Sequence, residues 1–208
     1  MSRPLQGALE ELGLRAGWCE RCGLPWLDCH CSPEVPAQST REMVGEHPTI
    51  LIDQREQAPL RFSSELKIEV ALLPCGDYSL RGLTAEIAIE RKSLADLVHC
   101  CGKDRPRFIE QIERMRSYRF RALVVEAHYT EAAIGAYRSR IEPASVIGTL
   151  IKVAHDLSVP VWFAEDASGA AQLVERMLLR EYKHARKRPD RIGEPDFARK
   201  YTRSGPGQ

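Results

Sequence analysis

The stretch IAIERKSLADL, residues 87–97, begins as an apolar β-strand, ends that strand in three adjacent charges and continues directly into a helix. Side chains alternate between the two faces of a strand, so Glu90 and Lys92 are expected on one face and Arg91 on the other. A carboxylate and an amine on one face suit metal-assisted hydrolysis. The carboxylate holds a divalent cation, while the amine orients or deprotonates the attacking water.

Strands and helices alternate on both sides of this stretch. Apolar or alternating runs predict strands at 49–53, 68–73, 78–80, 86–92, 122–127 and 160–164, and amphipathic runs predict helices at 93–100, 105–118, 143–157 and 168–187. Ser93 and Asp96 have the S-x-x-D spacing of a capping box, which marks the start of the first of these helices. The alternation predicts an α/β fold, with a mixed β-sheet flanked by helices.

A second carboxylate is needed to complete a metal site, and Asp77 is the candidate. It follows Gly76 in a predicted turn between two strands, and twelve residues separate it from Glu90. The order Asp77, Glu90, Lys92 resembles the D-x(n)-E-x-K pattern of restriction-endonuclease-like nucleases. Mg²⁺ prefers a few carboxylates together with water and substrate phosphate, so two or three acidic residues suffice.

A wider set of motifs accompanies these residues. In chain order they are IDQRE at 52–56, GDY at 76–78, ERKSLAD at 90–96, RFIEQ at 107–111 and ALVVE at 122–126. Together they resemble the XPF/ERCC-type nuclease domain over residues 49–187, because GD and ERKSLAD fill every position of the GD…ERKxxxD signature. The resemblance implies a restriction-endonuclease-like fold and a DNA endonuclease that cuts branched, flap or fork structures with Mg²⁺ or Mn²⁺, in DNA repair or recombination.

The resemblance also implies a role for each motif residue. Asp77 and Glu90 would ligate the catalytic metal, with Asp53 as a nearby third carboxylate. Lys92 would serve the water nucleophile, and Arg91 would either brace the site or contact phosphate. A catalytically silent DNA-binding or scaffold subunit is the alternative function, although such subunits typically lose the acidic and lysine positions that are present here.

Other acidic side chains have both a functional and a structural interpretation. Asp96 is either catalytic or only part of the helix cap. Glu56 is expected to pair with Arg55 or Arg91 rather than to bind metal. Glu126, at the end of a predicted strand, is either functional or solvated.

Basic residues concentrate in residues 103–121, with seven Lys and Arg against three Asp and Glu, and in residues 180–208, with nine against four. Such patches suit nucleic acid because phosphate contacts supply most non-specific affinity, although solvated helix faces give the same pattern. The candidate DNA contacts are Arg105, Arg107, Gln111 and Arg114. The resemblance also implies tandem helix-hairpin-helix motifs, but we do not expect them in the residues that follow the last predicted helix. DNA affinity is therefore expected from the basic patches, the cysteine segment, or a second subunit in a homodimer or a mixed complex.

Four cysteines lie within thirteen residues near the N-terminus, with the spacing C-x2-C-x6-C-x-C: Cys19, Cys22, Cys29 and Cys31. Four thiolates can close a tetrahedral Zn²⁺ site, and in a short segment such a site supplies the folding free energy. His30 could replace Cys29 or Cys31 as a ligand. We therefore predict a small zinc-binding module at residues 1–31, whose acidic charge favours a protein partner or a purely local role.

The remaining segments complete the predicted organisation. Residues 32–48 are rich in Pro, Ser and charge and have the composition of a linker, and residues 188–208 are expected to form a disordered basic tail. Hydrophobic residues make up 43% and charged residues 28% of the chain, as in ordinary globular proteins. No apolar run has the length of a membrane span and the N-terminus lacks a signal peptide, so we expect no membrane partner and an intracellular, cytoplasmic location.

Overall fold

The structure is a computed structural model that describes residues 45–187 of the chain. The predicted zinc module, most of the predicted linker and the predicted tail lie outside the described residues. The zinc site at Cys19, Cys22, Cys29 and Cys31 therefore stays a prediction. Within residues 45–187, no helix has both the length and the apolar character needed to cross a membrane.

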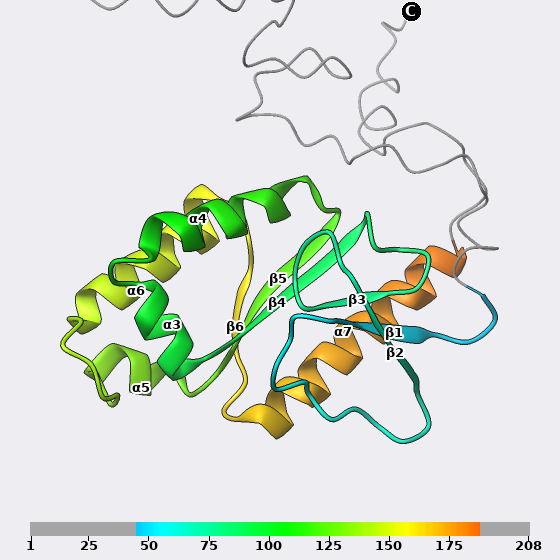
Figure 1. Cartoon of the computed structure of the whole chain (residues 1–208), viewed down its shortest axis with the longest axis horizontal. Coiled ribbons are helices and arrows are strands. Elements are labelled where there is room, and N and C mark those ends of the chain that lie inside the picture. The colour runs from blue at the N-terminus through cyan, green and yellow to red at the C-terminus, as the bar shows by residue number, and fades with distance from the viewer. Residues whose placement is uncertain (1–44, 188–208) are drawn as a thin grey trace, which may run out of the picture.

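A mixed β-sheet forms the centre of the domain. In the described part of the chain it has six strands, in the order β2-β1-β3-β4-β5-β6 (Figure 1). The strands are β1 (Thr49–Asp53), β2 (Lys67–Ala71), β3 (Tyr78–Leu80), β4 (Ile87–Ser93), β5 (Phe120–Glu126) and β6 (Val161–Phe163). Strand β3 is antiparallel to both β1 and β4, whereas β1 with β2, β4 with β5, and β5 with β6 are parallel. The predicted α/β class with a mixed sheet is confirmed.

Helices cover both faces of the sheet (Figure 1). They are α3 (Leu94–Cys100), α4 (Arg105–Arg114), α5 (Tyr129–Ile134), α6 (Pro143–Ile151) and α7 (Ala167–Lys187). One hydrophobic core forms between the sheet and α7, and a second core forms between the opposite face and helices α3 to α6. Strand β4 therefore lies inside the protein, with packed layers on both of its faces.

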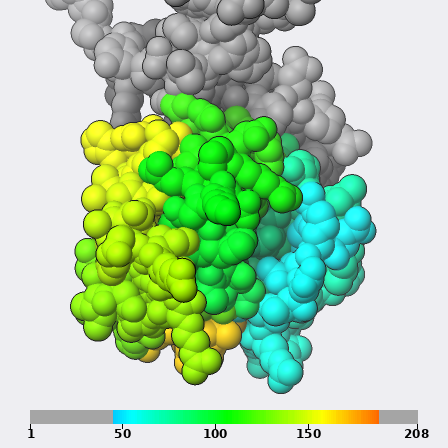
Figure 2. Space-filling model, turned by 60° about the vertical axis from the view of Figure 1, so that its left-hand side comes forward, coloured from blue at the N-terminus to red at the C-terminus, as the bar shows by residue number. Residues whose placement is uncertain are grey.

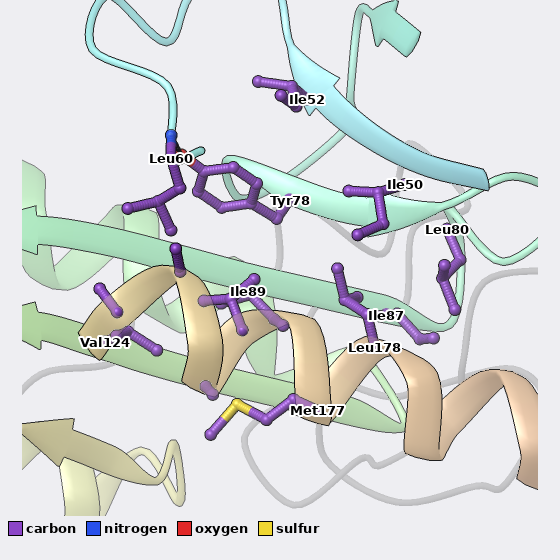
Figure 3. Packing of buried hydrophobic residues seen from close by; sticks show 14 of the residues in the cluster. Ile50, Ile52, Leu60, Tyr78, Leu80, Ile87, Ile89, Val124, Met177 and Leu178 are labelled. Atoms are coloured by element: carbon purple, nitrogen blue, oxygen red, sulfur yellow. Dashed lines mark hydrogen bonds between the residues drawn. The ribbon is translucent and has the colours of Figure 1, made fainter. Parts of the chain in front are cut away.

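The residues of β4 divide between the two cores by the alternation expected of a strand. Ile87 and Ile89 belong to the first core, where Figure 3 shows them facing helix α7. Ala88 belongs to the second core. Glu90 shares the face of Ala88, so the same alternation delivers its carboxylate to the side of the sheet that α3 and α4 cover.

Helix α5 is the element that the sequence pattern did not indicate. Its N-cap is His128, whose backbone N–H donates to the Glu131 carboxylate at 2.7 Å, while the Glu131 N–H donates to the His128 carbonyl at 3.1 Å. Gly135 ends the helix in the left-handed conformation, with φ 75°. Histidine is not among the residues that usually mark a helix start, which is why no helix was expected here. Helix α4 also ends at Arg114 and passes into a 3₁₀ turn, so it is shorter than predicted.

Candidate active site

Gly76 allows the chain to approach the backbone of β4 closely. Its φ is +74°, and a Cβ atom at this position would lie 2.9 Å from the carbonyl oxygen and 3.0 Å from the nitrogen of Ile89. Only glycine combines this conformation with this approach. The next residue, Asp77, then donates its backbone N–H to the Ile89 carbonyl at 2.7 Å. Gly76 thus places Asp77 against β4 immediately beside Glu90.

The carboxylate of Asp77 faces the charged end of β4. Its Oδ2 accepts a hydrogen bond from the backbone N–H of Arg91 at 2.8 Å. Burial, followed by the negative charge of Glu90, raises the pKa of Asp77 to about 7. The two carboxylates are therefore close enough for the charge on one to oppose the ionisation of the other.

Glu90 is almost completely buried, with 1% of its side chain exposed. Its Oε1 accepts hydrogen bonds from Lys92 Nζ at 2.5 Å and from Gln111 Nε2 at 2.7 Å. Its Oε2 is buried and has no hydrogen-bond partner among the described residues. The predicted placement of Glu90 and Lys92 on one face of the strand is confirmed, and the carboxylate presents one unsatisfied oxygen.

Lys92 is a cation at this site. Burial by itself would lower the pKa of its ammonium group, but the charge of Glu90 and the hydrogen bond to it outweigh burial and raise that pKa. A protonated ammonium group donates hydrogen bonds and has no lone pair with which to accept a proton. Of the two roles considered from the sequence, this arrangement favours orienting water over deprotonating it.

Asp53 is held differently from the other two acidic residues. Its Oδ1 accepts hydrogen bonds from the backbone N–H and the Nε of Arg55, at 2.8 and 2.6 Å, and its Oδ2 accepts one from the backbone N–H of Leu73 at 2.7 Å. Burial alone would raise the pKa of Asp53, but these hydrogen bonds outweigh burial and lower it. Both oxygens are thus engaged, and a role of Asp53 as third metal ligand stays a prediction.

The chemistry of the site fits a hard divalent cation. Asp77 and Glu90 supply carboxylate oxygens, one of which is a buried acceptor with no donor among residues 45–187. Within residues 45–187, no three His, Cys, Asp or Glu side chains converge as a complete metal site. Mg²⁺ is commonly bound through one or two carboxylates, with water and substrate phosphate as the other ligands, so two carboxylates are compatible with it.

Helix α4 places the four candidate DNA contacts in three different surroundings. Gln111 donates to Glu90 and so belongs to the acidic site, a role that the sequence did not reveal. Its position beside the buried Phe108 and Ile112 was the available signal, since it puts Gln111 at the edge of the packed face. Arg105 donates to Thr149 Oγ1 of α6 at 2.9 Å.

Arg107 and Arg114 are exposed on α4. Figure 2 shows the surface of α3 and α4 in green beside the cyan surface that begins with β1. Counted along the helix, Arg107, Gln111 and Arg114 stand at positions i, i+4 and i+7, which lie on one side of a helix. The two arginines therefore stand on either side of the residue that touches Glu90.

Arg91 projects from the face of β4 opposite to Glu90 and Lys92, as predicted. Its Nε lies 2.7 Å from Glu126 Oε1 and its Nη1 lies 3.6 Å from Glu56 Oε1. The expected pairing of Glu56 with an arginine is confirmed, and Glu126 has an ionic partner rather than a solvated carboxylate.

Asp96 lies at the start of α3. Its backbone N–H donates to Ser93 Oγ at 3.1 Å, and Ser93 Oγ donates to the Asp96 carboxylate at 2.7 Å. The structure thus gives Asp96 the capping contacts that its spacing predicted, and its side chain is exposed.

A comparison with protein families points to the same part of the chain. The ERCC4 domain model matches residues 52–177, which are more than half of the chain and include Asp53, Asp77, Glu90 and Lys92. The chain belongs to the ERCC4 domain family. Because this is a family of nuclease domains, the class of domain predicted from the GD and ERK motifs is confirmed.

Two solved structures are similar to this ERCC4 domain. XPF from Aeropyrum pernix in complex with DNA matches with 23% sequence identity and a TM-score of 0.53, covering 66% of this chain and 66% of that chain. XPF from Aeropyrum pernix matches with 22% identity and a TM-score of 0.49, covering 67% of this chain and 69% of that chain. The first similarity shows a shared fold, over about two thirds of the length of either chain. No curated protein matches the chain.

We expect Asp77→Asn to stabilise the metal-free ERCC4 domain at alkaline pH. The pKa of Asp77 in the folded protein, about 7, lies above its ordinary value of 3.8, so the folded state binds more protons than the unfolded state between these values. Stability is therefore lost as pH rises through this window, and asparagine has no proton to lose. In thermal melts with EDTA, the melting temperature of the variant should be higher than that of wild type by several degrees near pH 8, and by clearly less near pH 5. An equal difference at both pH values would contradict the assignment.

Gly76→Ala is expected to destabilise the domain by about 2 kcal/mol or more, because the residue has a positive φ and the new Cβ would meet the backbone of Ile89. The control is Gly148→Ala in helix α6, where a Cβ has no atom within 4 Å. This control should stabilise the helix by about 1 kcal/mol, the usual difference in helix propensity. Chemical denaturation of both variants measures the change in the free energy of unfolding. A Gly76→Ala protein as stable as wild type would show that stability does not require glycine at this close approach to Ile89.

Proposed function

We propose that this ERCC4 domain is a divalent-metal-dependent, structure-selective endonuclease that hydrolyses phosphodiester bonds in branched, flap or fork DNA. The observation that carries the proposal is the pair formed by Asp77 and Glu90. Burial and mutual repulsion raise the pKa of Asp77 to about 7, while Glu90 Oε2 is buried without a donor in the part of the chain that the structure describes. Two carboxylates kept together in this way are the arrangement that a bound cation would stabilise.

Asp77 and Glu90 would hold Mg²⁺ or Mn²⁺, and Asp53 is proposed as a third ligand if its carboxylate turns away from Arg55. When bound, such a cation polarises a phosphoryl oxygen and lowers the pKa of a water molecule that attacks it. Lys92 and Gln111 both donate to Glu90 Oε1 and so leave Oε2 available. These two donors therefore hold the carboxylate by one oxygen before any ligand arrives.

Lys92 is proposed to orient the attacking water and to stabilise negative charge on the phosphate. Its ammonium group keeps its proton, because its pKa is raised by Glu90. An ammonium group has three donors, and only one is needed for the hydrogen bond to Glu90. The remaining donors are free to meet water or a phosphate oxygen beside the carboxylates.

DNA is proposed to lie across the exposed side of α4. Arg107 and Arg114 flank Gln111, and with a rise of about 1.5 Å per residue their Cα atoms are about 10 Å apart along the helix axis. Contacts of this kind fix the register of a nucleic-acid strand without reading its sequence. The shared fold with XPF from Aeropyrum pernix, a protein solved in complex with DNA, supports the same kind of substrate.

Cleavage is expected to require both the carboxylates and the lysine. Fluorescently labelled flap, fork and fully paired duplex DNA should be incubated with Mg²⁺ or Mn²⁺. Wild type should cut the branched substrates in preference to the duplex, and Asp77→Asn and Lys92→Ala should each reduce the rate at least 100-fold, because they remove a metal ligand and the donor to the water. Circular dichroism should show an unchanged fold. Wild-type protein that binds these substrates and cuts none of them would instead indicate a catalytically silent DNA-binding subunit.

Arg107→Ala and Arg114→Ala are expected to weaken binding of fork DNA without changing the fold. If each side chain neutralises one phosphate, the slope of log affinity against log salt concentration should become shallower by about 1 for each substitution. Fluorescence anisotropy in EDTA measures this slope. Arg176→Ala is the matched control, because Arg176 is exposed on α7, on the other side of the sheet. A slope that changes equally in the control would contradict a DNA path over α4.

Three further assignments complete the proposal. The segment with Cys19, Cys22, Cys29 and Cys31 is proposed to hold structural zinc. A second copy of the chain or a partner subunit is proposed to add DNA affinity, because two exposed arginines provide a small contact. An intracellular, cytoplasmic location is proposed together with this zinc site, since cysteines stay reduced and available as zinc ligands in reducing compartments.

A further inference from the structure

The face of β4 that points away from the carboxylate pair has its own ionic cluster. The Arg91 guanidinium lies between Glu126, with 2.7 Å from Nε to Oε1, and Glu56, with 3.6 Å from Nη1 to Oε1. The exposed fractions of the three side chains are 12%, 9% and 8% for Arg91, Glu126 and Glu56. The cluster is thus nearly enclosed, and its charges depend on one another rather than on water.

The cluster joins three segments that are distant in sequence. Arg91 belongs to β4, and Glu126 is the last residue of β5. Glu56 lies in the turn after β1, where its backbone N–H donates to the carbonyl of Asp53 at 3.0 Å. Buried ion pairs contribute little net stability when compared with well-packed apolar residues, so stability alone is a weak reason for such a cluster. Holding the three segments in one arrangement is the role that its geometry supports.

Arg91 is also in contact with the carboxylate pair, through its backbone. Its N–H donates to Asp77 Oδ2 at 2.8 Å, and the same peptide group carries the carbonyl of Glu90. Anchoring the Arg91 side chain on one face of the strand therefore restricts the rotation of the backbone that aims this N–H. If the guanidinium group moved, the backbone of Arg91 could move with it. The hydrogen bond from this backbone N–H to Asp77, and the adjoining peptide group of Glu90, would then shift as well.

We propose that Glu126 and Glu56 are positioning residues of the metal site, which act through Arg91 to hold in place the Asp77 and Glu90 carboxylates that would bind one divalent cation. The proposal rests on the proposed function, because it assumes that these carboxylates bind the cation. Neither acidic residue touches metal or substrate in this account. Partners that orient a ligand in this way typically contribute 10- to 100-fold to metal affinity.

Mn²⁺ affinity is the measurement that separates positioning from simple stabilisation. We expect Glu126→Gln to raise the Kd for Mn²⁺, measured by isothermal titration calorimetry of the full chain, by about tenfold or more. Cleavage should fall at low Mn²⁺ and recover when Mn²⁺ is raised, because the ligands themselves remain. Glu56→Gln should have a smaller effect in the same direction, since its contact with Arg91 is longer.

Two more variants complete the test. Arg91→Lys should also raise the Kd for Mn²⁺, although it keeps the positive charge. A single ammonium group cannot reproduce the forked guanidinium that contacts both acidic residues. Glu86→Gln is the matched control: Glu86 is 11% exposed, its Oε2 lies 2.8 Å from Arg119 Nε, and it precedes the opposite end of β4. This control should lower the melting temperature and leave the Kd for Mn²⁺ unchanged.

The outcomes distinguish this proposal from the proposed function. In one outcome, wild type binds Mn²⁺ and cuts branched DNA, while Glu126→Gln and Glu56→Gln bind Mn²⁺ with unchanged affinity. The positioning role would then be wrong, and the proposed nuclease function would be retained. A loss of affinity in Glu86→Gln as large as in Glu126→Gln would also overturn it, because the effect would then follow from lost stability. Wild-type protein that neither binds Mn²⁺ nor cuts DNA would overturn the proposed function, and the positioning role with it.

Discussion

Keeping the partly buried Asp77 beside the fully buried Glu90 is the constraint on which the rest of the domain depends. A buried carboxylate costs free energy unless donors or cations compensate it, and two neighbouring carboxylates repel each other as well. Lys92 and Gln111 compensate one oxygen of Glu90, and the remaining cost appears as the raised pKa of Asp77. Such a pair persists only where the surrounding structure holds it. The packed cores on both faces of β4 provide that support.

The charged end of β4 places polar side chains among packed elements, and each charged side chain has its own hydrogen-bond or ionic partners there. Glu90 and Lys92 pair with each other on one face, and Gln111 arrives from α4 to complete them. On the other face, Arg91 is matched by acidic residues from β5 and from the turn after β1. Three adjacent charges can therefore end a buried strand because the neighbouring elements supply their partners.

Membership of the ERCC4 domain family agrees with this chemistry. The family match covers both the turn with Asp77 and the strand with Glu90, so the matched region contains the carboxylate pair. The proposed function follows from the pair and its surroundings: an oxygen without a donor from the described residues, a charged lysine beside it and exposed arginines along α4. Each of these features is a property of this chain, independent of any relative.

The sequence by itself determined the order of the six strands and of helices α3, α4, α6 and α7, together with the chemistry of the central strand. Alternation along residues 87–92 placed Glu90 and Lys92 on one face and Arg91 on the other, and the spacing of Ser93 and Asp96 located the start of α3. These are local properties, because they depend on the period of a strand or on hydrogen bonds within one turn of a helix.

Only the tertiary structure decided which residues complete the site. Gln111 is 21 residues from Glu90, and Glu126 is 35 residues from Arg91, so their contacts depend on how α4 and β5 pack against β4. The engagement of Asp53 by Leu73, 20 residues away, has the same origin. No local period records such a contact. A carboxylate that looks free in the sequence acquires its partners, and its pKa, only when distant segments are brought together.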